Sequence, residues 1–246
     1  MAQISASTSY SFTISNRPGV GQSYAIFSRA PTVEPFAQGL TSHAILIAHG
    51  VASISGTAFV SIPRGSYYAI CGTTHQDEAI TSHVFDRRPV TLSVLDSPVP
   101  RHGTTCVTQV LSDGLSFALW SGPAGDRGEV SAFCIQTGSD FTYEQATTNN
   151  FILGLGLSTS GTSQVGLYAS FTPSPRTTYQ VTPSKLFYVA AVKVQVNAPI
   201  RDEDLSNACQ VDFSTRSPYV KLVHSDNNAI EVVDSDFSSA TLSSKL

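Results

Sequence analysis

The sequence predicts an all-β protein: a sandwich of two antiparallel sheets with extended N- and C-terminal arms. Three observations support this class. Short stretches of β-branched and aromatic residues recur, turn-forming residues close each stretch, and helical periodicity is weak throughout. Only 13% of the 246 residues are charged, while 35 Ser and 24 Thr make up about a quarter of the chain. Coiled coils and helical bundles are excluded, because they need abundant Glu, Lys, Arg and Leu.

Ten strands are predicted, and each either alternates polar and apolar residues or contains a short apolar run. They are Ser9 to Ser15, His43 to His49, Val51 to Ile62, Val90 to Leu95, Thr104 to Leu111, Leu115 to Trp120, Glu129 to Gln136, Phe151 to Leu157, Gln164 to Phe171 and Leu186 to Val196. Alternation is clearest in residues 10–15, 57–62 and 192–196, so these strands should cover a core with one face only.

Turn and helix signals lie between the strands. Asp113 and Gly114 predict a hairpin turn, because that pair supplies the positive φ of a type I′ turn. Short helices are predicted at Asp77 to Val84 and at Asp202 to Ala208, the second of which opens with three acidic residues suited to a helix N-terminus.

No linker divides the chain, but its two ends differ from its middle. We expect an N-terminal strand and extended arm over residues 1–40, the sandwich core over 41–197 and a C-terminal arm over 198–246. Gly19 to Gly39 follows Pro18 and contains Pro31 and Pro35, and Ser206 to Leu246 is polar and acidic. Arms that pack on neighbouring subunits would account for both segments.

Charge and hydropathy limit the partners and the location. The formal net charge is −4, and ten Arg and four Lys are scattered without a basic block, so autonomous nucleic-acid binding is not expected. The apolar run Phe187 to Val192 is too short to cross a membrane, and we expect no secretory signal at the N-terminus. The last residues, Ser244-Lys245-Leu246, match a peroxisomal address that we do not expect to be used.

Four cysteines carry no recognisable pattern. Cys71, Cys106, Cys134 and Cys209 include no Cys-x-x-Cys, which argues against a zinc site and against a dense disulfide framework. Reduced, buried thiols are the favoured interpretation.

No catalytic, cofactor-binding or metal-binding residue is assigned, and the chain is not expected to be an enzyme or to need a cofactor. Gly-x-Ser-x-Gly is missing from the sequence, and nothing selects one of its six histidines as a catalytic base. A hydrolase would require His75, Asp77 and a cysteine or serine to converge in one site, and we keep this as a further class of function.

Several weaker signals have two interpretations each. The ligand-type residues from Cys71 to Glu78, with His83, suit a metal site or a polar loop whose acids cap a helix, and we favour the loop. His43 and His49 suit a ligand pair or polar strand ends. The acidic groups suit calcium or a solvated surface, which we favour; they are Asp202 to Asp204 and Asp226, Glu231, Asp234 and Asp236.

Glycines and aromatic residues likewise leave two interpretations. Gly154 and Gly156 favour a bulge or close packing over a phosphate loop, because no helix follows them. Trp120, Tyr67 and Tyr68 suit a sugar-binding platform or, more often for such residues, core packing.

Three features carry a resemblance to a known family. They are the nearly continuous strand signal from Ser42 to Pro63, the pair Gln164 to Phe171 and Leu186 to Val196 separated by a Pro-rich loop, and the extended ends. Taken together, the chain resembles the jelly-roll coat proteins of small icosahedral positive-strand RNA viruses, picornavirus-like or tymovirus-like.

The resemblance implies an eight-stranded jelly roll and a structural capsid subunit that assembles, alone or with related subunits, into a shell enclosing the genome. The implied partners are copies of itself, related capsid subunits and a host receptor, and the implied location is the virion, with the host cytoplasm during assembly. Residues 1–16 contain no Lys or Arg, in contrast to the basic arm of many coat proteins, so the RNA would be enclosed without strong direct binding. The alternative is a carbohydrate-binding β-sandwich, either a lectin or a viral receptor-binding spike, which requires a polar pocket and an aromatic platform.

Overall fold

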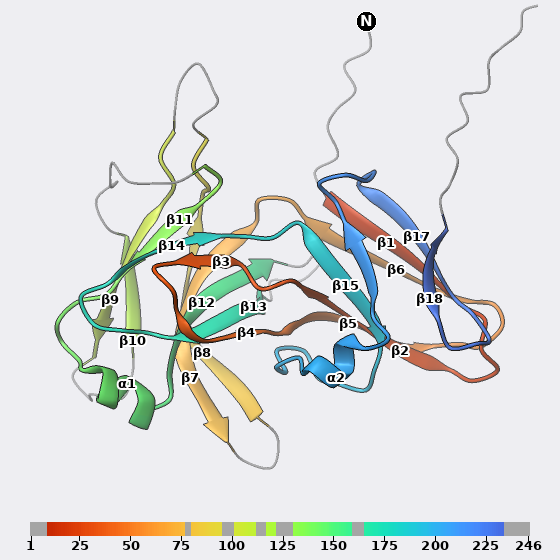
Figure 1. Ribbon diagram of the computed structural model, residues 1–246, viewed down its shortest axis with the longest axis horizontal. Coiled ribbons are helices and arrows are strands. Elements are labelled where there is room, and N and C mark those ends of the chain that lie inside the picture. Colours follow the sequence, from red (N-terminus) through yellow and green to blue (C-terminus); the bar gives the residue numbers. More distant parts are fainter. Residues whose placement is uncertain are drawn as a thin grey trace, which may run out of the picture.

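The computed structural model describes residues 9–76, 80–94, 101–111, 117–121, 130–158 and 165–233. Within these ranges the chain forms eighteen strands in four sheets and two short helices, which confirms the all-β class. The molecule is elongated, and its sheets lie in two lobes side by side (Figure 1).

One lobe, here called the terminal lobe, contains the first and last described strands in two four-stranded sheets. The first sheet has the order β18-β17-β1-β6. Its strands are β1 (Ser9–Asn16), β6 (Gly56–Pro63), β17 (Tyr219–His224) and β18 (Ile230–Val233). The second sheet has the order β16-β15-β2-β5. Its strands are β2 (Gln22–Ser28), β5 (Ala44–Val51), β15 (Leu186–Ala191) and β16 (Cys209–Asp212).

Aromatic side chains fill the space between these two sheets. The rings of Phe12 from β1 and Phe187 from β15 meet edge to face with centroids 6.1 Å apart, and Phe213 packs against both. Tyr10 stacks on Phe213 at 4.3 Å. Because side chains alternate along a strand, the intervening residues of β1 face outward.

The other lobe, here called the middle lobe, contains two five-stranded sheets. The first has the order β10-β9-β11-β14-β3. Its strands are β3 (Thr32–Glu34), β9 (Thr105–Val110), β10 (Phe117–Ser121), β11 (Phe133–Gln136) and β14 (Thr178–Thr182). The second has the order β4-β13-β12-β7-β8. Its strands are β4 (Gln38–Ser42), β7 (Tyr67–Gln76), β8 (Ile80–Val90), β12 (Phe151–Ser158) and β13 (Val165–Thr172).

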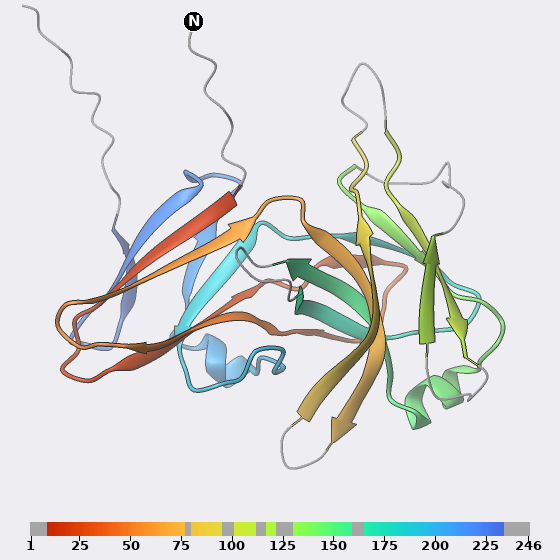
Figure 2. The ribbon, with the colours of Figure 1, turned by 180° about the vertical axis from the view of Figure 1, so that it is seen from behind.

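The middle lobe is closed by packing between its sheets, as in Phe171 against Tyr179 with ring centroids 4.8 Å apart. Helix α1 (Tyr143–Thr148) precedes β12 and begins with a capping box made by Thr142 and Gln145. Strands β7 and β8 extend beyond the other strands of their sheet (Figure 2).

The chain passes between the lobes four times, from β2 to β3, from β4 to β5, from β6 to β7 and from β14 to β15. One continuous hydrophobic cluster contains buried residues of both lobes, such as Phe12 and Leu153. The lobes therefore share one core and are not two separate domains joined by a linker.

Strand direction is mostly antiparallel, as predicted. Among the described strands, β1 with β17 and β9 with β11 are parallel. The pairing of β12 with β13 shifts register between Leu155 and Gly156, which confirms the bulge predicted from the glycines. Gly154 lies so close to β13 that a Cβ there would stand 2.0 Å from the carbonyl oxygen of Ala169.

Both segments expected to form arms on neighbouring subunits contain strands that pair within this chain. Gly19 to Gly39 includes β2 and β3, and residues 206–233 include β16, β17 and β18. Residues 234–246, with Asp234, Asp236 and the C-terminal tripeptide, lie outside the described part. The division at residues 40 and 197 stays a prediction.

Other local predictions differ from the structure in part. The helix expected from Asp77 to Val84 is wrong from residue 80 onward, because Ile80 to Val84 belong to β8 and pair with β7. The helix expected from Asp202 is confirmed as α2 (Asp202–Leu205). The strand expected from Val51 to Ile62 is interrupted by a turn at residues 52–55, and that expected from Val90 to Leu95 ends at Val90, with Val94 in an isolated bridge to Arg101.

Candidate interaction surfaces

His43 is a buried structural group that connects the lobes. It lies between β4 and β5, 1% exposed. Its Nδ1–H donates to the carbonyl oxygen of Asn197 at 3.0 Å, and Nε2 lies 2.8 Å from Oγ of Ser170 on β13. Burial lowers the pKa of His43 to about 4, because the charged form would lose its hydration. His49 is exposed on β5, so the two histidines do not form a ligand pair.

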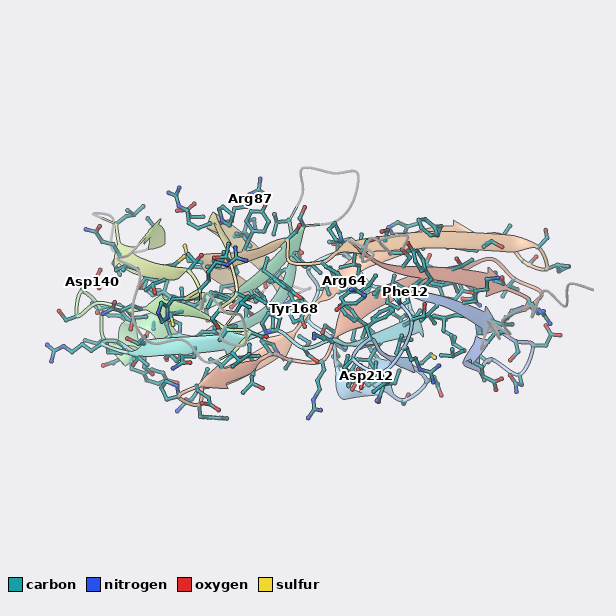
Figure 3. All side chains as sticks on the ribbon, turned by 90° about the horizontal axis from the view of Figure 1, so that it is seen from above. Phe12, Arg64, Arg87, Asp140, Tyr168 and Asp212 are labelled. Atoms are coloured by element: carbon teal, nitrogen blue, oxygen red, sulfur yellow. The ribbon has the colours of Figure 1, made fainter. Side chains whose placement is uncertain are left out.

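Tyr168 of β13 forms a second tie between the lobes, near the middle of the long axis (Figure 3). Its hydroxyl donates to the carbonyl oxygen of Ser184 at 2.9 Å and accepts from the backbone N–H of Ser184 at 3.0 Å. The hydroxyl of Ser28, at the end of β2, donates to it at 2.5 Å. Burial raises the pKa of Tyr168, so the phenol stays neutral.

Arg64 adds a contact in the link from β6 to β7, also near the middle of the molecule (Figure 3). Its guanidinium carbon stands 4.4 Å from the ring centroid of Tyr10, within the range of a cation–π interaction. This contact holds the start of the link against the terminal lobe, whereas His43 and Tyr168 connect the two lobes.

His224 is fully buried in the terminal lobe and is likewise structural. Its Nδ1 lies 3.0 Å from the hydroxyl of Tyr24, and its Nε2 lies 3.0 Å from Oδ1 of Asn228. A hydroxyl donor and an amide oxygen acceptor match the two nitrogens of a neutral imidazole. Burial raises the pKa of Tyr24 to about 12.

The ligand-type residues between Cys71 and His83 are spread apart as far as the structure describes them. Cys71 is buried, whereas His83 is exposed on β8. Only the backbone of His75 is described, and Asp77 and Glu78 lie outside the described residues. In the described part of the chain, no three His, Cys, Asp or Glu residues stand close enough together to hold a metal ion.

None of the four cysteines forms a disulfide bond: Cys71, Cys106 and Cys134 are buried, and Cys209 is half-buried. Burial raises the pKa of Cys71 to about 12 and that of Cys106 to about 11. A thiol held in its protonated form is a poor nucleophile and a poor metal ligand.

The acidic residues at α2 serve the helix and the surface. A side-chain oxygen of Asp204 accepts from the backbone N–H of Arg201 at 3.0 Å, and Glu203 pairs with Arg201 at 3.1 Å in an exposed position. Asp226 and Glu231 lie apart from them, in and after the turn that follows β17.

A groove of about 620 Å³ lies on the outer face of the sheet β4-β13-β12-β7-β8. Ile70 and Leu167 lie along it, with Ser82 and Arg87 from β8 and Asn197 beside them. Arg87 stands at the surface of the molecule (Figure 3). Tyr67 is buried in the core and Tyr68 is half-buried against Ile70, so these residues do not form an exposed aromatic platform. The side chain of Trp120 is not among those described.

Large apolar side chains are exposed on both lobes. The five most exposed among the described residues are Phe36 at 86%, Ile54 at 77%, Phe59 at 69%, Val20 at 60% and Tyr219 at 59%. Phe36 lies between β3 and β4, Phe59 and Tyr219 lie in one sheet of the terminal lobe, and Val20 and Ile54 lie in two neighbouring turns. Ile54 has φ of 69°, a conformation that is costly for a β-branched residue.

The two turns that present Val20 and Ile54 are held together by one amide. The Nδ2 atom of buried Asn16 lies 3.1 Å from the carbonyl oxygen of Val20, 2.8 Å from that of Val51 and 3.1 Å from that of Ala52. Side chains that are both exposed and held on a firm backbone suit contact with another macromolecule.

Comparison with known proteins gives no relative: the chain matches no protein-family description, no curated protein and no solved structure. The described residues also contain no helix that is long and apolar enough to span a membrane.

Proposed function

We propose that this chain is a structural coat-protein subunit, which assembles with copies of itself or with related subunits into an icosahedral shell around an RNA genome. The observation that carries the proposal is the set of five large apolar side chains, each more than half exposed, on a well-packed β fold. The sequence resemblance to coat proteins points the same way.

The distribution of these side chains supports several contacts per subunit. Phe36 lies on the middle lobe, and the other four lie on the terminal lobe. A subunit of a closed shell must contact neighbours on more than one side, whereas a simple dimer needs one face. With 13% charged residues, the chain also has little of the charge that keeps proteins apart.

A firm junction between the lobes fits this role. The hydrogen bonds of His43 and Tyr168 fix one lobe against the other, so that contacts at both ends keep one geometry. A rigid subunit loses less conformational freedom on assembly than a hinged one.

The eight-stranded jelly roll is the finer part of the proposal. It was expected over residues 41–197, and the parallel pairs β1–β17 and β9–β11 depart from an antiparallel jelly roll. In this proposal the shell encloses the RNA without binding it strongly, because basic residues are few and scattered. The proposed location is the virion, with the host cytoplasm during assembly and a host receptor as a further partner.

Electron microscopy of the purified full chain, with light scattering at tens of micromolar, tests the proposal. We expect uniform closed particles or their oligomeric precursors, with subunit contacts that bury more than about 2,000 Å² per subunit, the range of obligate interfaces. A monodisperse monomer at these concentrations would contradict the proposal.

One observation favours a second function, carbohydrate binding. The groove beside Ile70 contains Ser82, Arg87 and Asn197, which are hydrogen-bonding side chains next to an apolar surface. Binding on a glycan array that Arg87→Ala abolishes and His49→Ala leaves intact, in a protein that forms no particles, would favour this alternative.

A further inference from the structure

We propose that a second copy of the chain docks face to face on the outer side of the sheet β18-β17-β1-β6. This inference rests on the proposed function, because it names one surface through which subunits meet. The outer face is formed by residues that alternate with the core residues of each strand. These are Thr13 and Ser15 of β1, Thr57, Phe59 and Ser61 of β6, Tyr219, Lys221 and Val223 of β17, and Glu231 and Val233 of β18, whereas Ser11 of β1 is buried.

The outer face is apolar in places and uncharged overall. Phe59 is 69% exposed, Tyr219 59% and Val233 45%. Most of the remaining outer-face residues are Ser or Thr. Lys221 and Glu231 are its charged residues, and their charges cancel, so two such faces do not repel each other.

The strand register places Phe59 and Val233 at opposite ends of one row. Phe59 pairs with Thr13, Thr13 with Lys221, and Lys221 with Val233. The row therefore crosses the whole sheet from β6 to β18. The next row runs in the same way from Thr57 through Ser15 and Val223 to Glu231.

A twofold axis parallel to the strands, between the central strands β1 and β17, makes this face complementary to itself. Such an axis exchanges β6 with β18 and β1 with β17 while it keeps every row in line. Phe59 of each copy then lies over Val233 of the other, and Lys221 lies over Thr13. No two like charges stand directly opposite each other, and sheets packed face to face normally run nearly aligned.

A hollow next to Val233 gives the aromatic ring of Phe59 a place to insert. It has a volume of about 430 Å³, and Arg216, Tyr219, Lys221 and Val233 are among the residues that line it. An aromatic side chain seated in a pocket that excludes water is a frequent source of binding energy. In this arrangement, the twofold symmetry provides two such insertions.

Cross-linking between two single variants tests the arrangement. Phe59→Cys and Val233→Cys are mixed in equal amounts and treated with a short bis-maleimide reagent. We expect cross-linked dimers in the mixture and few in either variant alone, because the axis brings position 59 to position 233 and keeps identical positions several strands apart. Phe36→Cys, from the exposed residue on the middle lobe, is the matched control and should not cross-link to Val233→Cys.

Loss of affinity is the second measurement. Phe59→Ser removes both symmetry-related insertions and should weaken self-association about a thousandfold, about thirtyfold for each, while Phe36→Ser leaves this contact unchanged. Phe59 is exposed, so circular dichroism should show the same fold in both variants.

The outcomes separate this inference from the proposed function. Particles that form normally from Phe59→Ser, with no cross-link between positions 59 and 233, would overturn the docking arrangement and leave the coat-protein proposal standing. A wild-type chain that never associates would overturn both. A monomer in which Phe59→Cys resists maleimide would mean that residues of the same chain cover the face, and this would also overturn the inference.

Discussion

His43 shows how a single buried side chain is fixed by its surroundings. The imidazole joins the link between β4 and β5 to Ser170 in β13 and to the segment at Asn197. A neutral ring satisfies both contacts, since one nitrogen donates to a carbonyl and the other accepts from a hydroxyl. A proton on Nε2 would turn the Ser170 hydroxyl into the acceptor and would bury a positive charge without hydration.

This predicts a specific acid sensitivity. The pKa of His43 falls from an ordinary value of 6.5 to about 4 on folding, so the unfolded chain binds the proton first as the pH drops. Above pH 6.5 both states are neutral at His43, so this group does not change the free energy of unfolding. Between pH 6.5 and about 4 it lowers the free energy of unfolding by about 3 kcal/mol in total, and below that range it causes no further change. Urea unfolding at pH 7, 5.5 and 4 measures this decline.

A matched pair of variants isolates the effect. His43→Gln removes the titrating group and should flatten this part of the pH dependence, whereas the exposed His49→Gln should keep it. If the free energy of unfolding declines equally in His43→Gln and in the wild type between pH 7 and 4, the acid sensitivity belongs to other groups.

Asn16 is a second residue whose role depends on contacts distant in the chain. Its amide reaches the carbonyl oxygens of Val20, Val51 and Ala52 and so holds two turns together. We expect Asn16→Ala to lower the free energy of unfolding by about 2 kcal/mol, because buried carbonyl groups lose their donor. Ser15→Ala, at the neighbouring outward position of β1, is the control and should change it by less than about 0.5 kcal/mol in chemical denaturation. Equal effects of the two substitutions would refute this role.

The sequence alone could not assign these residue roles. His43 contacts Ser170 and Asn197, which are 127 and 154 positions away in the sequence. Nothing near residue 43 therefore distinguishes a buried structural histidine from a metal ligand at the surface. The burial of Tyr67 was one of the two interpretations left open, and only its neighbours in the fold decide between them.

At the scale of elements, glycines set how closely strands approach. Gly154 of β12 has no room for a methyl group, since a Cβ would meet the carbonyl oxygen of Ala169 in β13 at 2.0 Å. Gly154→Ala must therefore push two central strands apart, and we expect a loss of roughly 3 kcal/mol in the free energy of unfolding.

Gly19→Ala is the matched control for this prediction. Gly19 lies in a surface turn, and a Cβ there meets nothing within 4 Å. Thermal and urea unfolding should show a change within about 0.5 kcal/mol. A Gly154→Ala protein as stable as this control would contradict the close packing of β12 on β13.

Some strands were predictable from local patterns, and strands specified by distant pairing were not. β1 and β6 follow from alternation, and β12, β13 and most of β15 follow from short apolar runs. Residues 192–196 also alternate, but the strand expected there is wrong, because β15 ends at Ala191. The start of β8 was assigned to a helix because Asp77 and Glu78, which precede it in the sequence, suit a helix N-terminus, whereas pairing with β7 decides the outcome.

The terminal segments show the same limit. β17 carries the alternation Tyr219-Val-Lys-Leu-Val, and its alternate residues Val220 and Leu222 are buried. The signal was present but short, and the polar residues around it outweighed it. β17 becomes stable by pairing with β1, more than 200 residues earlier in the chain, which no local pattern reveals.

At the scale of the whole molecule, the shared core and the four crossings between lobes predict a single unfolding event. One hydrophobic cluster extends through both lobes, and His43 and Tyr168 connect them by hydrogen bonds. We expect one calorimetric transition whose van't Hoff and calorimetric enthalpies agree, measured on the dissociated chain. Two separated transitions would show that the lobes unfold independently and would remove the argument for a rigid subunit.

The central claim is that this chain is a building block whose exposed apolar surfaces are covered by other subunits. Sedimentation velocity of the purified chain at micromolar concentration tests it most directly. The account predicts large, uniform species that dissociate on dilution or when exposed apolar residues such as Phe59 are replaced by serine. A single species at the 26.1 kDa of one chain, unchanged across the concentration range, would contradict it.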